Sequence, residues 1–158
     1  LNQPDLEGYL TLPWHKVDHW YEEAEEVFVH ARDPYKRTDV MPSTRQVRVV
    51  IVGVTVAETS RASLLFETTL PTRYYIPSED INMEYLTATD SQTLCPYKGK
   101  ASYWSVSIDD QVHPDFVWSY PEPIAECPKI KGLLCFYNEK VDLYVDGMLQ
   151  ERPQSYWS

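Results

Sequence analysis

From Arg45 onward, short runs of β-branched and aromatic residues alternate with turn residues, a pattern typical of a mainly β domain. The clearest run covers residues 47–52, and together with residues 54–58 behind Gly53 it predicts a β-hairpin. Further strands are predicted at 63–67, 73–76, 101–108, 116–120, 132–137 and 141–145. Short antiparallel strands with one or two short helices predict a small barrel-like or tent-like domain of coiled antiparallel sheets.

The first 30 residues have a different character, because acidic residues are dense there and apolar residues are scattered. We therefore expect an acidic N-terminal arm at 1–30 and a single β domain at 31–158. Part of the arm carries apolar residues at helical spacing, which predicts two or three helical turns over 17–27. The residues on this stripe are Val17, Trp20, Tyr21 and Ala24.

Local signals mark one more helical turn and two β-turns. Serine and acidic residues after a proline predict a single helical turn at 77–81. The pairs Asp109-Asp110 and Asp146-Gly147 are typical of the tight turns between antiparallel strands.

Composition and charge narrow the class of protein. The chain has 158 residues, a formal net charge of -10 at pH 7 and a 13% aromatic content, with 12 Tyr and 5 Trp. This length suits one ordinary domain, and the negative charge disfavours nucleic-acid and anionic-membrane partners. We expect an acidic, soluble, cytoplasmic protein that binds a small molecule of unknown identity. A homodimer is an open alternative to a monomer. No segment approaches the length of a membrane-spanning helix.

The three cysteines, Cys95, Cys127 and Cys135, form no Cys-x-x-Cys pair. An odd number of unpaired cysteines fits neither a disulfide framework nor a four-thiolate zinc site. Reduced thiols in the cytoplasm are the simplest interpretation. We predict no metal site, and the sequence points to no particular cofactor.

The loop from Cys95 to Gly99 is the first candidate for chemistry. A thiolate is nucleophilic, and a cationic neighbour such as Lys98 would lower its pKa. The strand that follows places Tyr103 and Trp104 on opposite faces. The alternative for Cys95 is a buried side chain that packs as a small hydrophobe.

A second candidate surrounds the turn at 67–75. Arg73 is suited to hold an anion, and Glu67 is suited to act as an acid or base. On a strand, Arg73 and Tyr75 share one face and Tyr74 takes the other. An ion pair between Glu67 and Arg73 that only braces the turn remains an equal alternative.

Several separated motifs in order resemble those of domain-of-unknown-function family four hundred twenty-seven, found in bacteria and fungi. They lie at 32–37, 65–68, 71–75, 95–99, 101–105 and 118–121. The resemblance implies a small, mostly β fold of coiled sheets without an established activity, sometimes labelled nucleotidyltransferase-like. It also implies a functional surface at the matching residues, which are Arg32, Asp33, Glu67, Arg73, Tyr74, Cys95, Tyr97, Lys98, Tyr103 and Trp104.

These observations lead to one main functional expectation and two alternatives. The main one is a β domain that binds an anionic or aromatic small molecule beside Arg32, Asp33, Arg73, Tyr74, Tyr97, Tyr103 and Trp104. The first alternative is an enzyme with Cys95 as nucleophile or Glu67 as general base, assisted by Lys98. The second is a protein-interaction module that docks through its acidic arm.

Overall fold

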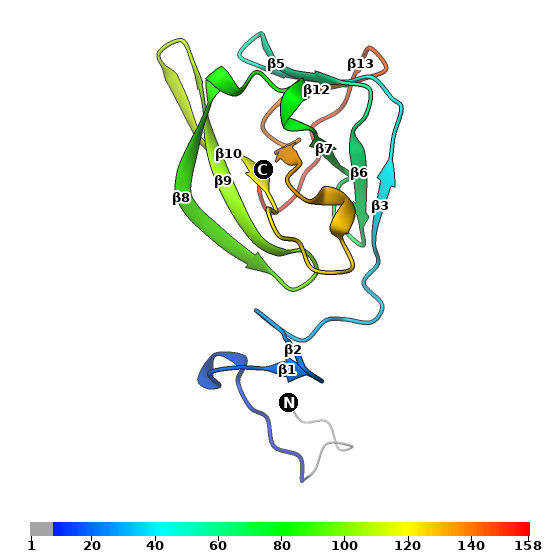
Figure 1. Ribbon diagram of the computed structural model, residues 1–158, viewed down its shortest axis with the longest axis vertical. Helices are drawn as coiled ribbons and strands as arrows, with labels where there is room; N and C mark the ends of the chain where they lie inside the picture. The colour runs from blue at the N-terminus through cyan, green and yellow to red at the C-terminus, as the bar shows by residue number, and fades with distance from the viewer. Residues whose placement is uncertain (1–7) are drawn as a thin grey trace.

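A seven-stranded antiparallel sheet forms the main wall of the molecule in the computed structural model, which describes residues 8–158. Its strand order is β3-β6-β7-β11-β10-β9-β8, so β3 and β8 are free edges and the sheet stays open. The strands are β3 (Thr38–Pro42), β6 (Ser63–Glu67), β7 (Arg73–Ile76), β8 (Leu86–Cys95), β9 (Gly99–Ile108), β10 (Gln111–Ser119) and β11 (Leu134–Phe136). Figure 1 shows β8, β9 and β10 curving along one side of the molecule, opposite β6 and β3.

A smaller, four-stranded antiparallel sheet with the order β13-β12-β4-β5 closes one end of the molecule (Figure 1). Its strands are β4 (Val47–Ile51), β5 (Val54–Thr59), β12 (Asp142–Val145) and β13 (Met148–Leu149). The helical segments of the described chain are three-residue 3-10 turns, which are η2 (Trp14–Lys16), η3 (Ser78–Asp80), η4 (Met83–Tyr85) and η5 (Pro128–Ile130). None of the helices found in residues 8–158 is long and apolar enough to cross a bilayer.

The two faces of the seven-stranded sheet bury different kinds of side chain. Successive residues of a strand point to opposite faces, so each strand contributes to both. The face toward the four-stranded sheet carries Leu64, Ile76, Val106, Val117, Leu134 and Phe136. The opposite face carries Leu65, Tyr75, Ala101, Trp118 and Cys135, with Tyr120 and Ile130 packed beside them. We call these the core face and the site face.

Two bulges bend the long strands of this sheet. Pairing shifts between Ala88 and Gln92 where β8 meets β9, and between His113 and Val117 where β10 meets β9. Asp115 lies inside the second bulge with a positive φ of 52°, and its carboxylate accepts hydrogen bonds of 2.7 Å from two hydroxyl groups of β8. Because bulges increase local bend and twist, the sheet becomes concave on its site face.

Sequence patterning located most of these elements. Strands were predicted where β4, β5, β6, β7, β9, β10, β11 and β12 form, and both turn pairs connect neighbouring strands as expected. The helical turn predicted at 77–81 is confirmed as η3. The mainly β fold of coiled antiparallel sheets is therefore confirmed, whereas β3, β8 and β13 were not predicted.

The helix predicted over 17–27 is wrong. This segment forms a small hairpin of β1 (Tyr21–Glu22) and β2 (Glu25–Glu26), beside a stacked pair of indoles, Trp14 and Trp20, whose ring centroids lie 4.6 Å apart. A helix would place four glutamates within little more than one turn, where like charges repel. In the hairpin Glu22 and Glu25 face each other, but the Arg32 guanidinium lies 3.4 Å from the first and 3.8 Å from the second, and the His19 ring lies 2.7 Å from Glu26.

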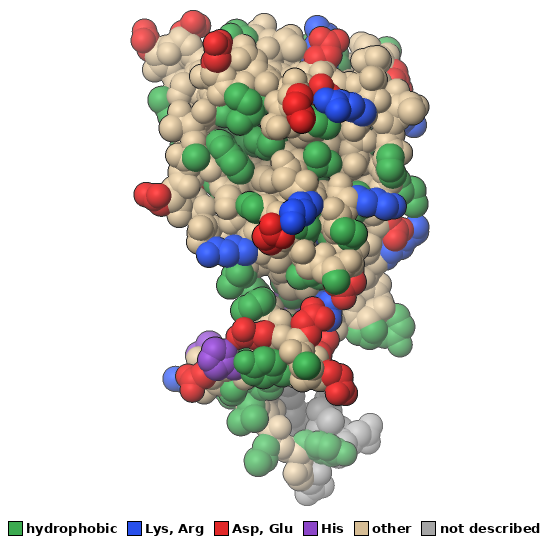
Figure 2. Space-filling model, viewed as in Figure 1, with side chains coloured by type: hydrophobic (Ala, Val, Ile, Leu, Met, Phe, Trp, Pro, Cys, Tyr) green, Lys and Arg blue, Asp and Glu red, His purple; other side chains and the backbone are tan. Residues whose placement is uncertain are grey.

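The hairpin projects away from the two sheets (Figure 1), and acidic and hydrophobic side chains gather on its surface (Figure 2). Arg32 ties this arm to the rest of the molecule, because its guanidinium lies 2.7 Å from Glu126 and 3.4 Å from Glu22. The part of the expected acidic arm at residues 1–7 lies outside the described residues.

Candidate functional site

The concave site face encloses a cavity of about 340 Å³. Strands β6 and β7 contribute one side of it through Leu65, Glu67, Arg73 and Tyr75, and the turn between β8 and β9 contributes another. Segments far from the sheets complete the lining, with His30 and Lys36 before β3 and Trp157 after β13. The lining of the cavity thus comes from the seven-stranded sheet, from the segment before β3 and from the segment after β13.

One end of the cavity holds a buried carboxylate between two lysines. The two oxygens of Glu67, whose side chain is 4% exposed, lie 2.5 Å from the Lys98 amine and 3.1 Å from the Lys36 amine. Burial disfavours the charged form of Lys98, but the neighbouring Cys95 and Glu67 outweigh this effect and raise its pKa. Each oxygen of the Glu67 carboxylate thus forms a salt bridge with a lysine.

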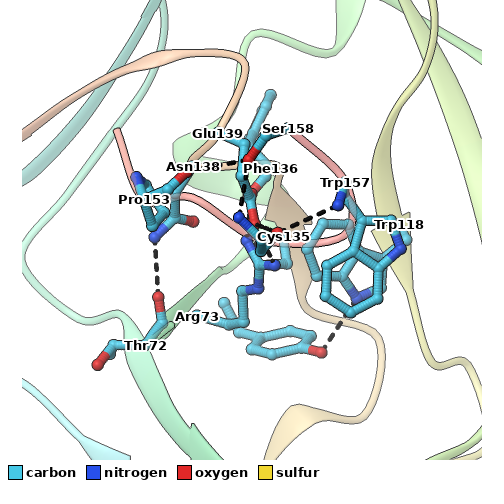
Figure 3. Close-up of polar contacts among 12 residues, drawn as sticks. Thr72, Arg73, Trp118, Cys135, Phe136, Asn138, Glu139, Pro153, Trp157 and Ser158 are labelled. Atoms are coloured by element: carbon cyan, nitrogen blue, oxygen red, sulfur yellow. Dashed lines mark hydrogen bonds and ion pairs between the residues drawn. The ribbon is translucent and has the colours of Figure 1, made fainter. Parts of the chain in front are cut away.

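A second buried ion pair joins Arg73, which lines the same cavity, to Glu139 (Figure 3). The Arg73 guanidinium donates two hydrogen bonds of 2.6 and 2.7 Å to Glu139, and the Ser155 hydroxyl donates a third to the same carboxylate. Burial alone would raise the pKa of Glu139, but the bonds from Arg73 and Ser155 lower it. Arg73 is thus fully engaged by a partner within the chain.

Aromatic rings surround this pair and extend along the cavity. The Arg73 guanidinium lies 5.4 Å from the ring centre of Trp118 and 5.3 Å from that of Trp157 (Figure 3), within the range of cation–π attraction. Trp118 also donates a hydrogen bond of 3.1 Å to the Tyr75 hydroxyl. Four more rings line the space, those of Tyr97, Tyr103, Tyr120 and Tyr137.

The buried phenols remain neutral at ordinary pH. Desolvation is the main cause that raises the pKa of Tyr75, Tyr120 and Tyr137 well above the usual range for tyrosine. A neutral phenol retains its proton, so each of these hydroxyls can donate a hydrogen bond to an acceptor. The cavity therefore combines flat apolar walls with several hydrogen-bond donors.

The three cysteines occupy different environments. Cys95 is half-buried and lines the cavity next to Lys98. Cys127 and Cys135 are buried, and desolvation raises the pKa of the first to about 11 and of the second to about 12. Of the three thiols, Cys95 is the one that a small molecule in the cavity would meet.

The structure brings six of the predicted site residues to this cavity and leaves four elsewhere. The six are Glu67, Arg73, Cys95, Tyr97, Lys98 and Tyr103. Tyr74 and Trp104 pack on the core face instead, because they alternate with Arg73 and Tyr103 along their strands. Arg32 and Asp33 border a neighbouring groove, where the Asp33 backbone N–H donates a hydrogen bond of 2.8 Å to the Tyr97 hydroxyl.

Several cavity residues were not predicted from the sequence. Strand alternation already placed Tyr75 beside Arg73, and this signal could have identified it. Trp118 on β10, Tyr120 just after it and Tyr137 just after β11 also line the cavity, and none of them was predicted as a site residue. Lys36 lies within the motif at 32–37 but was not among the predicted site residues, and Trp157 lies outside every motif; both reach the cavity from the flanks of the chain.

Within residues 8–158, no group of three or more His, Cys, Asp or Glu side chains is placed to hold a metal ion. A comparison with curated proteins gives no match. A comparison with protein-family models gives a match over residues 39–147, more than half of the chain. The matched region contains both sheets except the first residue of β3 and the strand β13. The chain belongs to the family described as a domain of unknown function (DUF427).

Proposed function

We propose that this protein binds a small aromatic or anionic molecule in the cavity on the site face. One observation carries the proposal: the cavity of about 340 Å³ is walled by aromatic rings and contains buried ionic groups. Ligand sites are typically concave and mostly apolar, with a few polar groups that fix orientation. This volume is at the small end of such sites, so it suits a molecule of about one or two rings.

The energetic argument supports a binding role over a purely structural one. Buried ion pairs contribute little net stability compared with well-packed apolar side chains, yet this face holds two of them around an open space. A face built only for packing would bury mainly aliphatic side chains and no charges, as the centre of the core face does. The charged and aromatic side chains are therefore better explained by a ligand that contacts them.

A pair of tyrosine variants tests this proposal. We expect saturation-transfer NMR with a library of one- and two-ring acids and amides to detect binding to the wild-type protein. Tyr103→Ala removes a ring from the cavity wall and should weaken binding about tenfold or more, since stacked rings contribute about 1 kcal/mol or more. Tyr144→Ala is the matched control, because Tyr144 lies on β12 and packs beside Arg48 outside the cavity. Fragments that bind equally to all three proteins would contradict the proposed location.

Covalent chemistry at Cys95 is a second candidate function. It is favoured by the position of this half-buried thiol in the cavity, next to the Lys98 amine, because reactive cysteines lie in electropositive, partly accessible surroundings. In this proposal Cys95 is the nucleophile, Lys98 stabilises negative charge, and Glu67 holds Lys98 in place.

Thiol labelling separates this candidate from simple binding. At pH 7.5, iodoacetamide should modify Cys95 at least about a hundredfold faster than Cys127 and Cys135, because burial keeps the other two thiols protonated. Peptide mass spectrometry over a time course measures the three rates. Slow and equal labelling of all three cysteines would count against a nucleophilic role.

A further inference from the structure

The charges around the cavity do not cancel. Three cations line it, Lys36, Lys98 and Arg73, but the lining carboxylate Glu67 and the adjoining Glu139 supply only two negative charges. The site therefore carries an excess of one positive charge inside a protein whose formal net charge is -10. A positive site within a strongly acidic molecule requires a specific explanation, since the average surface repels anions.

The surplus charge can be assigned to Lys36. Arg73 donates two hydrogen bonds to Glu139, and Lys98 forms the shorter contact with Glu67, at 2.5 Å. Lys36 shares the carboxylate that Lys98 already neutralises, at 3.1 Å, and its side chain is 26% exposed. Its amine also lies 4.7 Å from the ring centre of Tyr97, at the wall of the cavity. Lys36 is thus the cation best able to contact an incoming anion.

From this arrangement we infer that the ligand is a flat aromatic acid with a single negative charge, and that Lys36 is the residue that selects this charge. The inference rests on the proposed binding function and deepens it. A monoanion matches the single excess positive charge, whereas a neutral ligand leaves it unbalanced and a dianion overcompensates it. Aromatic walls accept the flat body of such a molecule, and the phenol hydroxyls of Tyr75 and Tyr120 can donate hydrogen bonds to its oxygens.

The position of Lys36 in the sequence indicates which part of the chain would determine the charge preference. It lies before the region matched by the family model, which begins at residue 39, whereas Glu67, Arg73 and Lys98 lie inside it. The segment that carries Lys36 is fixed over the cavity by the Arg32 salt bridge to Glu126 at 2.7 Å and by the hydrogen bond from Asp33 to Tyr97 at 2.8 Å. In this proposal, the residue that selects the charge of the ligand lies on the segment before β3, outside the region matched by the family model.

The test uses three probes that share one ring system: 2-naphthoate, 2-naphthamide and 2-naphthyl phosphate. Isothermal titration calorimetry at low salt measures the affinity of each probe for the wild-type protein and for the Lys36→Met, Lys36→Arg and Lys100→Met variants. Lys100 is an exposed lysine on β9 and does not line the cavity, so its variant controls for net charge.

We expect wild-type protein to bind the naphthoate about tenfold more tightly than the amide and more tightly than the phosphate. Lys36→Met should abolish the preference for the acid, and a circular dichroism spectrum like that of the wild-type protein shows that the variant is folded. Lys36→Arg and Lys100→Met should retain the preference.

Equal binding of acid and amide to the wild-type protein would overturn the inference and leave the proposed function intact. The same holds for tighter binding of the phosphate, or for a preference that survives in Lys36→Met. A wild-type protein that binds none of the three probes would contradict the proposed function itself, and with it the inference.

Discussion

The core face and the site face of the seven-stranded sheet are formed by neighbouring residues of the same strands, yet their chemistry differs. Ile76 packs between the sheets while Tyr75 reaches the cavity, and Phe136 and Tyr137 diverge in the same way. The fully buried side chains of the core face are aliphatic, with the exception of Phe136. The site face is aromatic and ionic, and it lines a cavity of about 340 Å³.

This difference shows that the aliphatic packing and the buried ionic groups lie on opposite faces of one sheet. Filled aliphatic packing contributes most of the stability of a folded domain, whereas buried ion pairs are close to neutral when compared with apolar side chains. The buried ion pairs on the site face can therefore be tolerated, because the packing on the core face supplies the stability of the fold. Substitutions on adjacent residues can test this division of roles.

The largest expected contrast is between Phe136→Ala and Tyr137→Ala. Phe136 is 3% exposed in the core, and its truncation leaves a cavity that should lower the free energy of unfolding by about 4 kcal/mol. Tyr137 is half-buried at the existing cavity, so its truncation should lower it by less than about 2 kcal/mol. Urea unfolding measures both values. Equal losses would mean that the two faces do not differ in this way.

The next effect concerns a single buried charge. Glu67→Gln leaves Lys98, 11% exposed in its side chain, without its counter-ion and should lower the free energy of unfolding by about 3 kcal/mol. The double variant Glu67→Leu, Lys98→Met removes both charges and should recover most of this loss. Chemical denaturation of the two variants is the measurement, and a double variant as unstable as the single one would refute this account of the ion pair.

Alkaline pH should weaken the protein through its site face. The pKa of Tyr120 is raised on folding, so its contribution to stability is complete below about pH 10 and is lost as pH rises further. Tyr120→Phe should lessen this loss by up to about 1.4 kcal/mol per pH unit. Tyr156→Phe is the control, because Tyr156 is 94% exposed and should leave the slope unchanged. Denaturation curves between pH 8 and pH 11, a range set by the usual tyrosine pKa of about 10, provide the test.

The smallest contrast compares Ile76→Val with Tyr75→Phe. Each should lower the free energy of unfolding by about 1 kcal/mol, but for different reasons: the first removes a methylene from the core, and the second leaves the Trp118 N–H without its acceptor. Tryptophan fluorescence distinguishes them, because only the second change alters the surroundings of an indole. An unchanged emission spectrum for Tyr75→Phe would argue against the Tyr75 hydrogen bond.

Alternation along single strands was the part of this architecture that could be predicted from the sequence. It separated Arg73 and Tyr75 from Tyr74, and Tyr103 from Trp104, and the structure follows this division. Tyr74 and Trp104 were nevertheless grouped with the functional surface, because the family resemblance marks motifs without distinguishing the faces of a strand. Strand periodicity was the better guide at these positions.

Other elements had no local signal that could reveal them. Strand β8 is an exposed edge with many polar residues, so it lacks an apolar stripe. Strand β3 ends in Pro42, which is suited to an edge but is untypical of strands in general. The ion pair between Arg73 and Glu139 joins residues 66 positions apart, and Trp157 lies farther still along the chain. Such contacts depend on tertiary packing, which a pattern in one segment does not encode.

The position of Trp157 has a practical consequence for how the protein is immobilised or labelled. This indole is a wall of the cavity, and Ser155 beside it donates a hydrogen bond to the buried Glu139. A purification tag, dye or sensor-chip linker attached at Ser158 would strain the short segment that positions Trp157 and would disturb this wall of the cavity. Attachment at Asp110, in the exposed turn between β9 and β10, keeps both flanks free.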